Sequence, residues 1–242
     1  MAAAPRTKRI AQIIESRALV LGRTQVGDAD LLLQLLTEER GLLTVSARSA
    51  RRPSSRLGAL EPMQTLRVKF ALPEGRDIGT LRESVVTAAR GSMLTDEPRM
   101  LAALSMLHGV KVLVLPGAVD HALFTMVEAS LDAIERAVDV ARTALHANVR
   151  IADILGFSLS FEACVRCGKP CPDGSPALIE PSEGGLVCRA CGGGPLRMSP
   201  DERRQCAAFM HDPTVLLEDG LMATLADILR DMLRAHGTLR RR

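Results

Sequence analysis

The 242-residue sequence predicts an α+β protein: a β-rich N-terminal part, then a helical part that carries a four-cysteine, zinc-ribbon-like insertion. Three observations predict this class. Short apolar or alternating segments fill residues 10–88, and apolar spacing of three and four residues replaces them over residues 95–160. Two Cys-x-x-Cys pairs then face each other across twenty residues in a stretch rich in Gly and Pro.

Five short strands are expected in the first part. They cover residues 17–22, 31–37, 42–47, 63–72 and 79–86. Gly, Asp or Pro residues separate them, and the segment LRVKF alternates apolar and basic residues, as a half-buried strand does. Leucine favours helix in LLLQLLT, but the shortness of this segment and its flanking turns favour strand. Five short strands over about eighty residues fit a small barrel or sandwich.

The helical part begins near residue 95. We expect Thr95 to cap a helix with Pro98 in its first turn. From Asp120, apolar residues recur every three or four positions up to Leu145, which predicts one amphipathic helix of about seven turns. Residues 149–157 add a further turn or two.

Two more helices follow the cysteine-bearing stretch. Ser199 is expected to cap the first of them, with Pro200 at its first position. The second is an amphipathic helix over residues 220–237 with basic residues near its end.

Composition indicates a soluble protein in a reducing compartment. Six cysteines are too few for a disulfide scaffold of this length. The N-terminal segment MAAAPRTKRIAQ carries basic residues without the apolar core of a secretory signal. No uncharged apolar run approaches the roughly 18–20 residues of a membrane span. We therefore expect a cytoplasmic protein with no membrane partner, which favours metal binding over disulfides for its cysteines.

Charge is unevenly distributed along the chain. Residues 1–90 hold 15 Lys and Arg against 9 Asp and Glu, whereas residues 91–163 hold 5 against 9. This shift predicts two domains: residues 1–90, with a surface suited to a polyanion, and residues 91–242, with the insertion at 161–195. A solvated basic surface without a partner fits the same numbers.

The two Cys-x-x-Cys pairs predict one metal site. Their members are Cys164, Cys167, Cys188 and Cys191. Each pair spans a tight turn that can point both thiolates at one centre, and four thiolates at tetrahedral geometry are the common ligands of structural zinc. We expect one structural Zn²⁺ per chain. It would supply roughly 10 kcal/mol or more of folding free energy to an insertion that lacks a core of its own.

Other roles for the cysteines fit less well. A redox pair would sit singly in a βαβ context that is absent here, and a disulfide cluster conflicts with a reducing compartment. Four thiolates leave no position for water, so a Lewis-acid role is not expected. Cys171 lies too far from Cys167 to complete the tight spacing and is interpreted as a bystander. Cys206, on a helix face, is interpreted as a buried small hydrophobe.

Catalytic motifs are missing from the sequence. The five histidines are scattered and fit no metal or base spacing. No H-E-x-x-H, G-x-S-x-G, P-loop or dinucleotide-binding glycine pattern occurs. We therefore expect neither enzyme activity nor a small-molecule substrate.

A basic loop is the candidate binding site for nucleic acid. Residues 46–62, SARSARRPSSRLGALEP, bring four arginines close together: Arg48, Arg51, Arg52 and Arg56. Arginine makes bidentate contacts to phosphate, and the serines add hydroxyl donors. A mobile, solvated loop accounts for this stretch equally well. Lys8 and Arg9, in the basic N-terminal segment, are further candidate DNA contacts.

The order of these features resembles the RecO family of bacterial recombination mediators. The resemblance rests on GDADLLLQLLTEERGLLTVSARSARRPSSRLGALEPM, on LRES in the last strand, on LFTMVEASLDAIERA, and on LGFSLSFEACVRCG leading into GGLVCRAC. It spans nearly the whole chain in the same order, and its most specific blocks are residues 37–52 and 156–191.

The resemblance implies an N-terminal OB-fold, a helical domain and a zinc ribbon set into it. It implies binding of single- and double-stranded DNA and annealing of complementary strands. It also implies work with RecR and the single-strand DNA-binding protein (SSB), so that RecA loads on SSB-coated DNA during repair. A cytoplasmic, nucleoid-associated protein without enzyme activity follows from the same resemblance.

Departures from the family pattern bear on binding. Ser49 stands where the family tends to have glycine, so the loop is expected to lack an easy positive-φ position. Leu57 replaces a common aromatic, and Leu159 a common proline. Phe70 is the only aromatic residue among residues 1–90. Stacking on bases, worth roughly 1–3 kcal/mol per base, is therefore mostly missing, and DNA affinity should come from charge and fall steeply with salt.

Two other functions compete with a DNA-binding mediator. An enzyme with a zinc centre is disfavoured by the four thiolates and the missing base. A protein–protein adaptor with a structural zinc site, whose barrel has lost DNA affinity, fits the missing aromatics and the acidic helical part.

Overall fold

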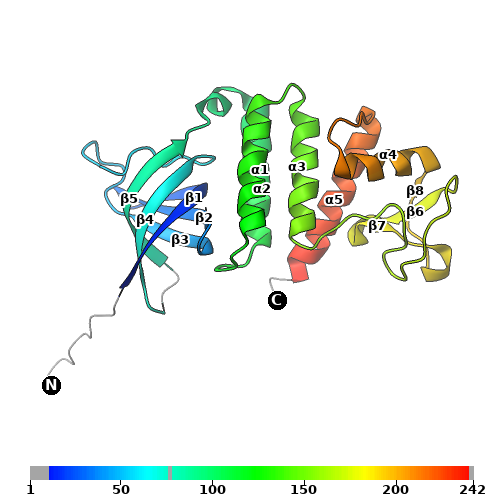
Figure 1. The fold of residues 1–242 in the computed structure, drawn as a ribbon, viewed down its shortest axis with the longest axis horizontal. Helices are drawn as coiled ribbons and strands as arrows, with labels where there is room; N and C mark the ends of the chain where they lie inside the picture. Colours follow the sequence, from blue (N-terminus) through cyan, green and yellow to red (C-terminus); the bar gives the residue numbers. More distant parts are fainter. Residues whose placement is uncertain (1–10, 76–77, 240–242) are drawn as a thin grey trace, which may run out of the picture. The chain divides into compact units, whose positions relative to one another are not determined.

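Two units make up the chain in the computed structural model: residues 1–135 and residues 136–242 (Figure 1). The structure describes residues 11–75 and 78–239, with side chains up to residue 236. The compact units thus divide at the end of the second α-helix. The sequence predicts a domain boundary at residue 90, which stays a prediction.

A closed five-stranded barrel opens the first unit. Its strands are β1 (Ala11–Val26), β2 (Asp30–Thr37), β3 (Gly41–Ala47), β4 (Thr65–Pro73) and β5 (Ile78–Ala88). They pair in the order β1-β2-β3-β5-β4, and β4 returns to β1. All five predicted strands are confirmed, LLLQLLT included. The first is longer than predicted, because pairing with β4 extends it back to Ala11 and pairing with β2 extends it to Val26. This barrel is an OB-fold, as the resemblance implied.

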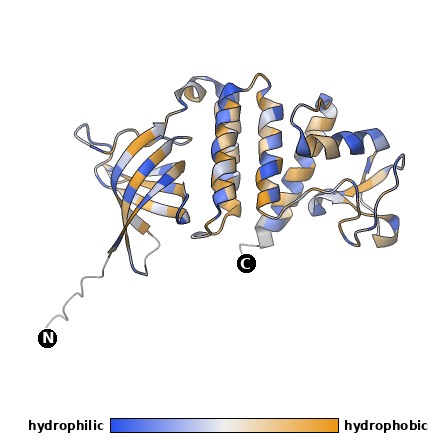
Figure 2. Ribbon diagram, in the orientation of Figure 1, coloured by the Kyte–Doolittle hydropathy of each residue, from blue (hydrophilic) through white to orange (hydrophobic). Residues whose placement is uncertain are grey.

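Alternation along the strands fills the barrel interior. Leu66, Val68 and Phe70 are buried, whereas Arg67 and Lys69 between them lie on the outer face. Figure 2 shows the alternation as hydrophobic and hydrophilic bands along the strands. Each large apolar side chain removed from water contributes about 1.5–3 kcal/mol. The inward-facing residues form one apolar cluster that includes Val20, Leu33, Leu35, Val45, Leu66 and Leu81.

Two backbone contacts fix the ends of β3. At its far end, Thr44–Ser46 pair in parallel with Ile78–Thr80 of β5 and close the barrel. At its start, Gly41 has a φ of +63°, and a Cβ there would lie 1.8 Å from the carbonyl oxygen of Ala118. Only glycine permits this approach, so Gly41 sets where β3 begins.

Five α-helices follow the barrel in the described residues. They are α1 (Glu97–Leu113), α2 (His121–Arg136), α3 (Val140–Ile154), α4 (Pro200–His211) and α5 (Asp219–Leu239). The predicted cap and first turn of α4 are confirmed: Ser199 and Glu202 form a reciprocal capping box, and Pro200 opens the helix. The predicted last helix is confirmed as α5.

The predicted start of α1 is wrong. Thr95 ends a short 3-10 turn at Gly91–Thr95, and its hydroxyl donates to the carbonyl of Ser92. Asp96 caps α1 instead, because its carboxylate accepts the N–H of Arg99 at 3.1 Å. A carboxylate at this position also interacts favourably with the helix dipole.

The predicted seven-turn helix is also wrong, because two helices occupy that stretch. Asp139 accepts the N–H of Arg142 at 2.9 Å and so caps a new helix, α3. Val138, which the apolar spacing placed on the buried face, is fully exposed in the break. The turn predicted at 149–157 belongs mainly to α3, which ends before Gly156, where φ is +83°.

A buried arginine fastens α2 to the barrel within the first unit. The Arg90 side chain is 2% exposed and pairs with Asp132 of α2 at 2.6 Å. The same guanidinium donates to the carbonyl of Met63 at 2.7 Å and to the hydroxyl of Thr65 at 3.0 Å. Arg90 thus satisfies acceptors from two elements at once, which a shorter or neutral side chain would not do.

Glu128 extends this network to β1. Its carboxylate accepts the Thr65 hydroxyl at 3.0 Å and pairs with Arg17 at 2.5 Å. Arg17 also lies over the ring of Phe124, 5.2 Å from its centroid. The acids of α2 therefore neutralise arginines of the barrel at this contact.

The second unit combines α3, α4 and α5 with a small sheet. Strands β6 (Ala177–Glu180), β7 (Gly185–Leu186) and β8 (Leu196–Met198) pair in the order β7-β6-β8. The prediction of an insertion without a core is wrong, because this sheet and the helices share one apolar cluster. Its members include Phe161, Cys164, Ile179, Leu186, Met198, Phe209, Leu225 and Ile228.

We predict that Arg90→Ala lowers the free energy of unfolding of the first unit by about 2–4 kcal/mol. The substitution leaves buried acceptors without a donor and half-buried Asp132 without its ion-pair partner. Urea unfolding followed by circular dichroism measures this loss. Arg67→Ala, on the exposed outer face of β4, should change stability by less than about 0.5 kcal/mol. Equal effects of the two substitutions would contradict the role given to Arg90.

Candidate metal centre and nucleic-acid interface

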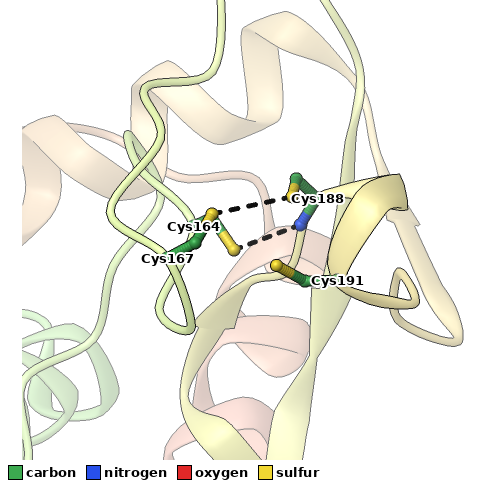
Figure 3. Close-up of side chains that lie close together, drawn as sticks. All are labelled: Cys164, Cys167, Cys188 and Cys191. Carbon is green, nitrogen blue, oxygen red and sulfur yellow. Dashed lines mark hydrogen bonds between the residues drawn. The ribbon is translucent and has the colours of Figure 1, made fainter.

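The structure brings the four predicted cysteines together. Their Sγ atoms all lie within 4.8 Å of one another, and the set is the only group of three or more metal-ligating side chains found in the described part of the chain. Cys167 Sγ and Cys188 Sγ are 3.8 Å apart, one from each pair (Figure 3). Tetrahedral geometry with bonds of about 2.3 Å requires sulfur separations of about 3.8 Å. The donors therefore fit a soft or borderline metal ion.

Each cysteine pair sits on a tight backbone turn. In the first, Gly168 N–H donates to Cys164 O at 2.8 Å, and in the second Cys191 N–H donates to Cys188 O at 2.9 Å. Gly168 and Gly192, expected to serve these turns, both have positive φ, at +71° and +107°. Glycine adopts this conformation without strain, so the spacing predicted from the sequence is realised in the backbone.

Hydrogen bonds hold the two turns against each other. The N–H of Cys188 points at Cys164 Sγ at 3.4 Å (Figure 3). Val165 N–H donates to Leu186 O at 2.8 Å, joining the first turn to β7. Arg166 pairs with Glu183 and also donates to the carbonyl of Cys191. The four thiols are therefore positioned by the protein scaffold.

The thiols differ in their ionisation. Backbone N–H groups, that of Cys188 above all, lower the pKa of Cys164 to about 6. Side-chain hydrogen bonds with the neighbouring thiols, first Cys188, raise the pKa of Cys191 to about 12. Four sulfurs this close cannot all be thiolates without a compensating cation. A bound divalent ion would remove this conflict, because it deprotonates the thiols that coordinate it.

The remaining two cysteines lie outside the cluster. Cys171 is half-buried, and its N–H donates to Glu162 O at 2.8 Å. Cys206 is fully buried in the core of the second unit, as predicted, and burial raises the pKa of its thiol to about 12.

The predicted basic loop connects β3 to β4. All four of its arginines, Arg48, Arg51, Arg52 and Arg56, are exposed. Lys8 and Arg9 lie outside the described residues. The loop is held to the β1–β2 turn: Arg51 N–H donates to Ala29 O at 3.0 Å, and its side chain donates to Asp28 O at 3.2 Å.

Ser49 corrects an expectation about this loop. The sequence predicts that serine here denies the loop an easy positive-φ position, yet Ser49 has a φ of +54°. Its N–H donates to the carboxylate of Asp30 at 2.7 Å, a charge-assisted bond that offsets the strain. The loop thus keeps its turn without glycine.

Sequence reasoning missed one arginine. Arg48 and Arg56 line a pocket of about 380 Å³ whose opposite wall is β5, with Thr80 and the exposed Arg82. The signal was present in LRES, since Leu81 is buried in the barrel and the next residue must point outward. Arg51 and Arg52 belong to the same loop but do not line this pocket.

The arginines of this surface are free of acidic partners. Among the described residues, no ion pair involves Arg48, Arg51, Arg52, Arg56 or Arg82. The single aromatic of the barrel, Phe70, is buried inside it. This loop, the pocket and Arg82 form what we call the arginine surface. It offers unpaired positive charge and hydroxyl groups, without rings on which bases could stack.

No helix among the described residues is long and apolar enough to cross a bilayer.

Comparison with known proteins matches both parts of the chain. A family model described as "Recombination protein O N terminal" matches residues 11–90, and one described as "Recombination protein O C terminal" matches residues 94–239.

Individual relatives are similar over most of the chain. It is 31% identical to the DNA repair protein RecO of Pelobacter propionicus over 178 residues, which are 73% of this chain and 71% of that protein. It is 29% identical to the protein of the same name from Rubrobacter xylanophilus, over 74% of this chain and 71% of the relative. With the protein of that name from Anaeromyxobacter sp. strain K, 28% identity extends over 88% of this chain and 82% of the relative.

We predict that a thiol-specific reagent at pH 8 readily modifies only Cys171 in the metal-loaded chain. After a chelator removes the metal, the four clustered thiols should also react. Cys206 should react only in denaturant, because its raised pKa and burial leave almost no accessible thiolate. Mass spectrometry of modified peptides identifies each site. Modification of Cys206 before the chelator is added would contradict this order.

Proposed function

Because the chain belongs to the Recombination protein O family, whose relatives are DNA repair proteins, we propose that it is a DNA-binding recombination mediator. In this role it binds single- and double-stranded DNA, anneals complementary strands and, together with RecR, helps RecA load on SSB-coated DNA. The role needs no catalytic step of its own. The observation that carries the proposal is the arginine surface of the barrel.

Charge supports DNA binding at this surface. Arginine presents a fork of donors that matches phosphate, and the five unpaired guanidinium groups bear no carboxylate that a phosphate would have to displace. Ser54 and Ser55 line the same pocket and can donate to phosphate oxygens. These contacts address the backbone of DNA, so binding should be independent of base sequence.

The missing aromatics determine the kind of binding. An OB-fold without exposed rings loses roughly 1–3 kcal/mol per base of stacking and depends on counterion release. Five phosphate contacts to a single strand imply a slope of log affinity against log salt of about −3.5. Neutralising phosphates also lowers the repulsion between two strands, which favours annealing.

We also propose that the second unit holds one structural zinc ion. Cys164, Cys167, Cys188 and Cys191 would hold one Zn²⁺ with four thiolates, which fill a tetrahedral coordination sphere. Its contribution would be to link the two cysteine turns, which otherwise meet only through a few hydrogen bonds and a shared core.

One observation favours a different function. The barrel has no exposed aromatic residue among its described residues. This fits a protein–protein adaptor that has lost DNA affinity, because such a protein needs no rings for base stacking. The unpaired arginines speak against this reading, and DNA binding decides between the two.

RecR and SSB are the proposed protein partners, and the cytoplasm, in association with the nucleoid, is the proposed location. Both follow from the family, and no described surface is assigned to either protein.

We predict that Arg51→Glu/Arg52→Glu weakens binding of labelled single-stranded DNA by about 10- to 100-fold at 100 mM salt and reduces the salt slope by about 1.5. Fluorescence anisotropy across a salt series measures both quantities. Arg204→Glu/Arg230→Glu, with the same change in charge on exposed helix positions of the second unit, is the control and should bind nearly as tightly as the unmodified chain. If the unmodified chain does not bind DNA at low salt, or if its affinity does not change with salt, the proposed function is wrong.

We predict one zinc per purified chain and loss of that zinc in Cys164→Ser and in Cys191→Ser. Cys171→Ser should retain it, because Cys171 lies outside the cluster. Atomic absorption or mass spectrometry of the native protein counts the metal. Equal zinc content in all three variants would refute the four-ligand site.

A further inference from the structure

A cleft on the cysteine-bearing part of the second unit is unused by the function proposed above. It has a volume of about 370 Å³, within the range of ligand-binding pockets. Residues 169–172 and 175–178 form one side, residues 186–190 the other, and Arg197 of β8 completes the lining. We call this the ribbon cleft.

The ribbon cleft carries only positive charge on its side chains. Lys169, Arg189 and Arg197 line it, and no Asp or Glu does. All three are exposed, and none takes part in an ion pair with another described residue. Arg166 shows the contrast, since the nearby carboxylate of Glu183 neutralises it.

The metal centre beside the cleft does not cancel this charge. Cys188 is the one member of the cluster that lines the cleft. Four thiolates around a divalent cation carry a net charge of −2, whereas the three cations carry +3. The lining therefore remains positive when the metal is bound, which suits an anionic ligand.

The uncharged lining is apolar and rich in proline. Pro170, Pro172 and Pro176 line one side, and Leu178 and Val187 add aliphatic surface. Guanidinium planes are surfaces on which a nucleobase can stack, and proline rings add apolar surface against which a base can pack. Proline also lacks an N–H, so this side offers few donors to the backbone of an extended peptide. The combination favours nucleotides over an acidic peptide.

We propose that the ribbon cleft binds a short stretch of single-stranded DNA and gives the chain a second DNA site. Bases lie against the prolines, and phosphates contact Lys169, Arg189 and Arg197. This inference rests on the proposed function, to which it adds a way for one chain to hold two complementary strands: one on the arginine surface and one in the cleft.

The test uses Lys169→Glu/Arg197→Glu in the full chain, because Arg189 lies between two cysteines of the cluster and its substitution would risk the metal. Arg204→Glu/Arg230→Glu is the control of equal charge change. Zinc content and circular dichroism establish that both variants are folded. If the charge-reversal variant does not fold, Lys169→Ala/Arg197→Ala replaces it in the test.

Isothermal titration at low salt with an oligothymidylate of about ten nucleotides counts the sites. The unmodified chain and the control should bind two equivalents, and the cleft variant one. The cleft variant should also anneal complementary strands about tenfold more slowly than the control.

Arg51→Glu/Arg52→Glu separates this inference from the proposed function. If both hold, this variant keeps one equivalent, that of the cleft, and adding Lys169→Glu/Arg197→Glu removes it. If the arginine surface does not bind DNA, Arg51→Glu/Arg52→Glu binds oligothymidylate as the unmodified chain does, whether or not the cleft is a DNA site. The cleft proposal is overturned if the cleft variant still binds two equivalents and anneals at the control rate. It is equally overturned if an acidic, leucine-rich peptide binds the cleft and oligothymidylate does not displace it.

Discussion

The parallel pairing of β3 with β5 is the constraint on which the arginine surface depends. Antiparallel neighbours in sequence would leave the β3–β4 loop beside β4. Because Thr44–Ser46 pair with Ile78–Thr80 instead, the loop leaves β3 next to the residues that follow Thr80. Arg82 then faces Arg48 and Arg56 across one pocket, although more than twenty residues separate them in the chain. Barrel closure thus converts a loose run of arginines into a surface with two walls.

Charge pairing elsewhere in the first unit sharpens this surface. Arg17 and Arg90 lie on the contact with α2, where Glu128 and Asp132 neutralise them. Part of the acidic excess of the helical segment is therefore neutralised at this contact. The loop arginines have no such neighbours, so they keep their charge for a ligand. Basic residues of the barrel therefore divide into a structural set and a free set.

The second unit depends on a different device. Gly184 and Gly185 let other segments approach closely: a Cβ on Gly184 would lie 2.1 Å from Met232 Sδ of α5. The cysteine turns are therefore built on a segment that already packs against a helix. A metal bound there would fix the spacing of the two turns rather than create the fold, and the cleft beside them would inherit that rigidity.

Sequence reasoning recovered the features set by local pattern. The strict alternation of LRVKF, the cysteine spacing and the Ser199 cap each depend on a few adjacent residues, and each appears in the structure. It failed where a distant or competing contact decided the outcome. Apolar spacing continued through Val138, but the carboxylate of Asp139 started a new helix. Ser49 took a positive φ because Asp30, from another strand, accepts its N–H. Arg82 joined the site only through barrel closure, which no local pattern encodes.

The central claim is that DNA lies on the arginine surface of the barrel. Hydrogen–deuterium exchange of the full chain, with and without single-stranded DNA at low salt, tests it most directly. The account predicts slower exchange in residues 48–57 and 80–82 when DNA is bound, and a return to the free rates at high salt. Bound DNA that leaves these residues unprotected would contradict it.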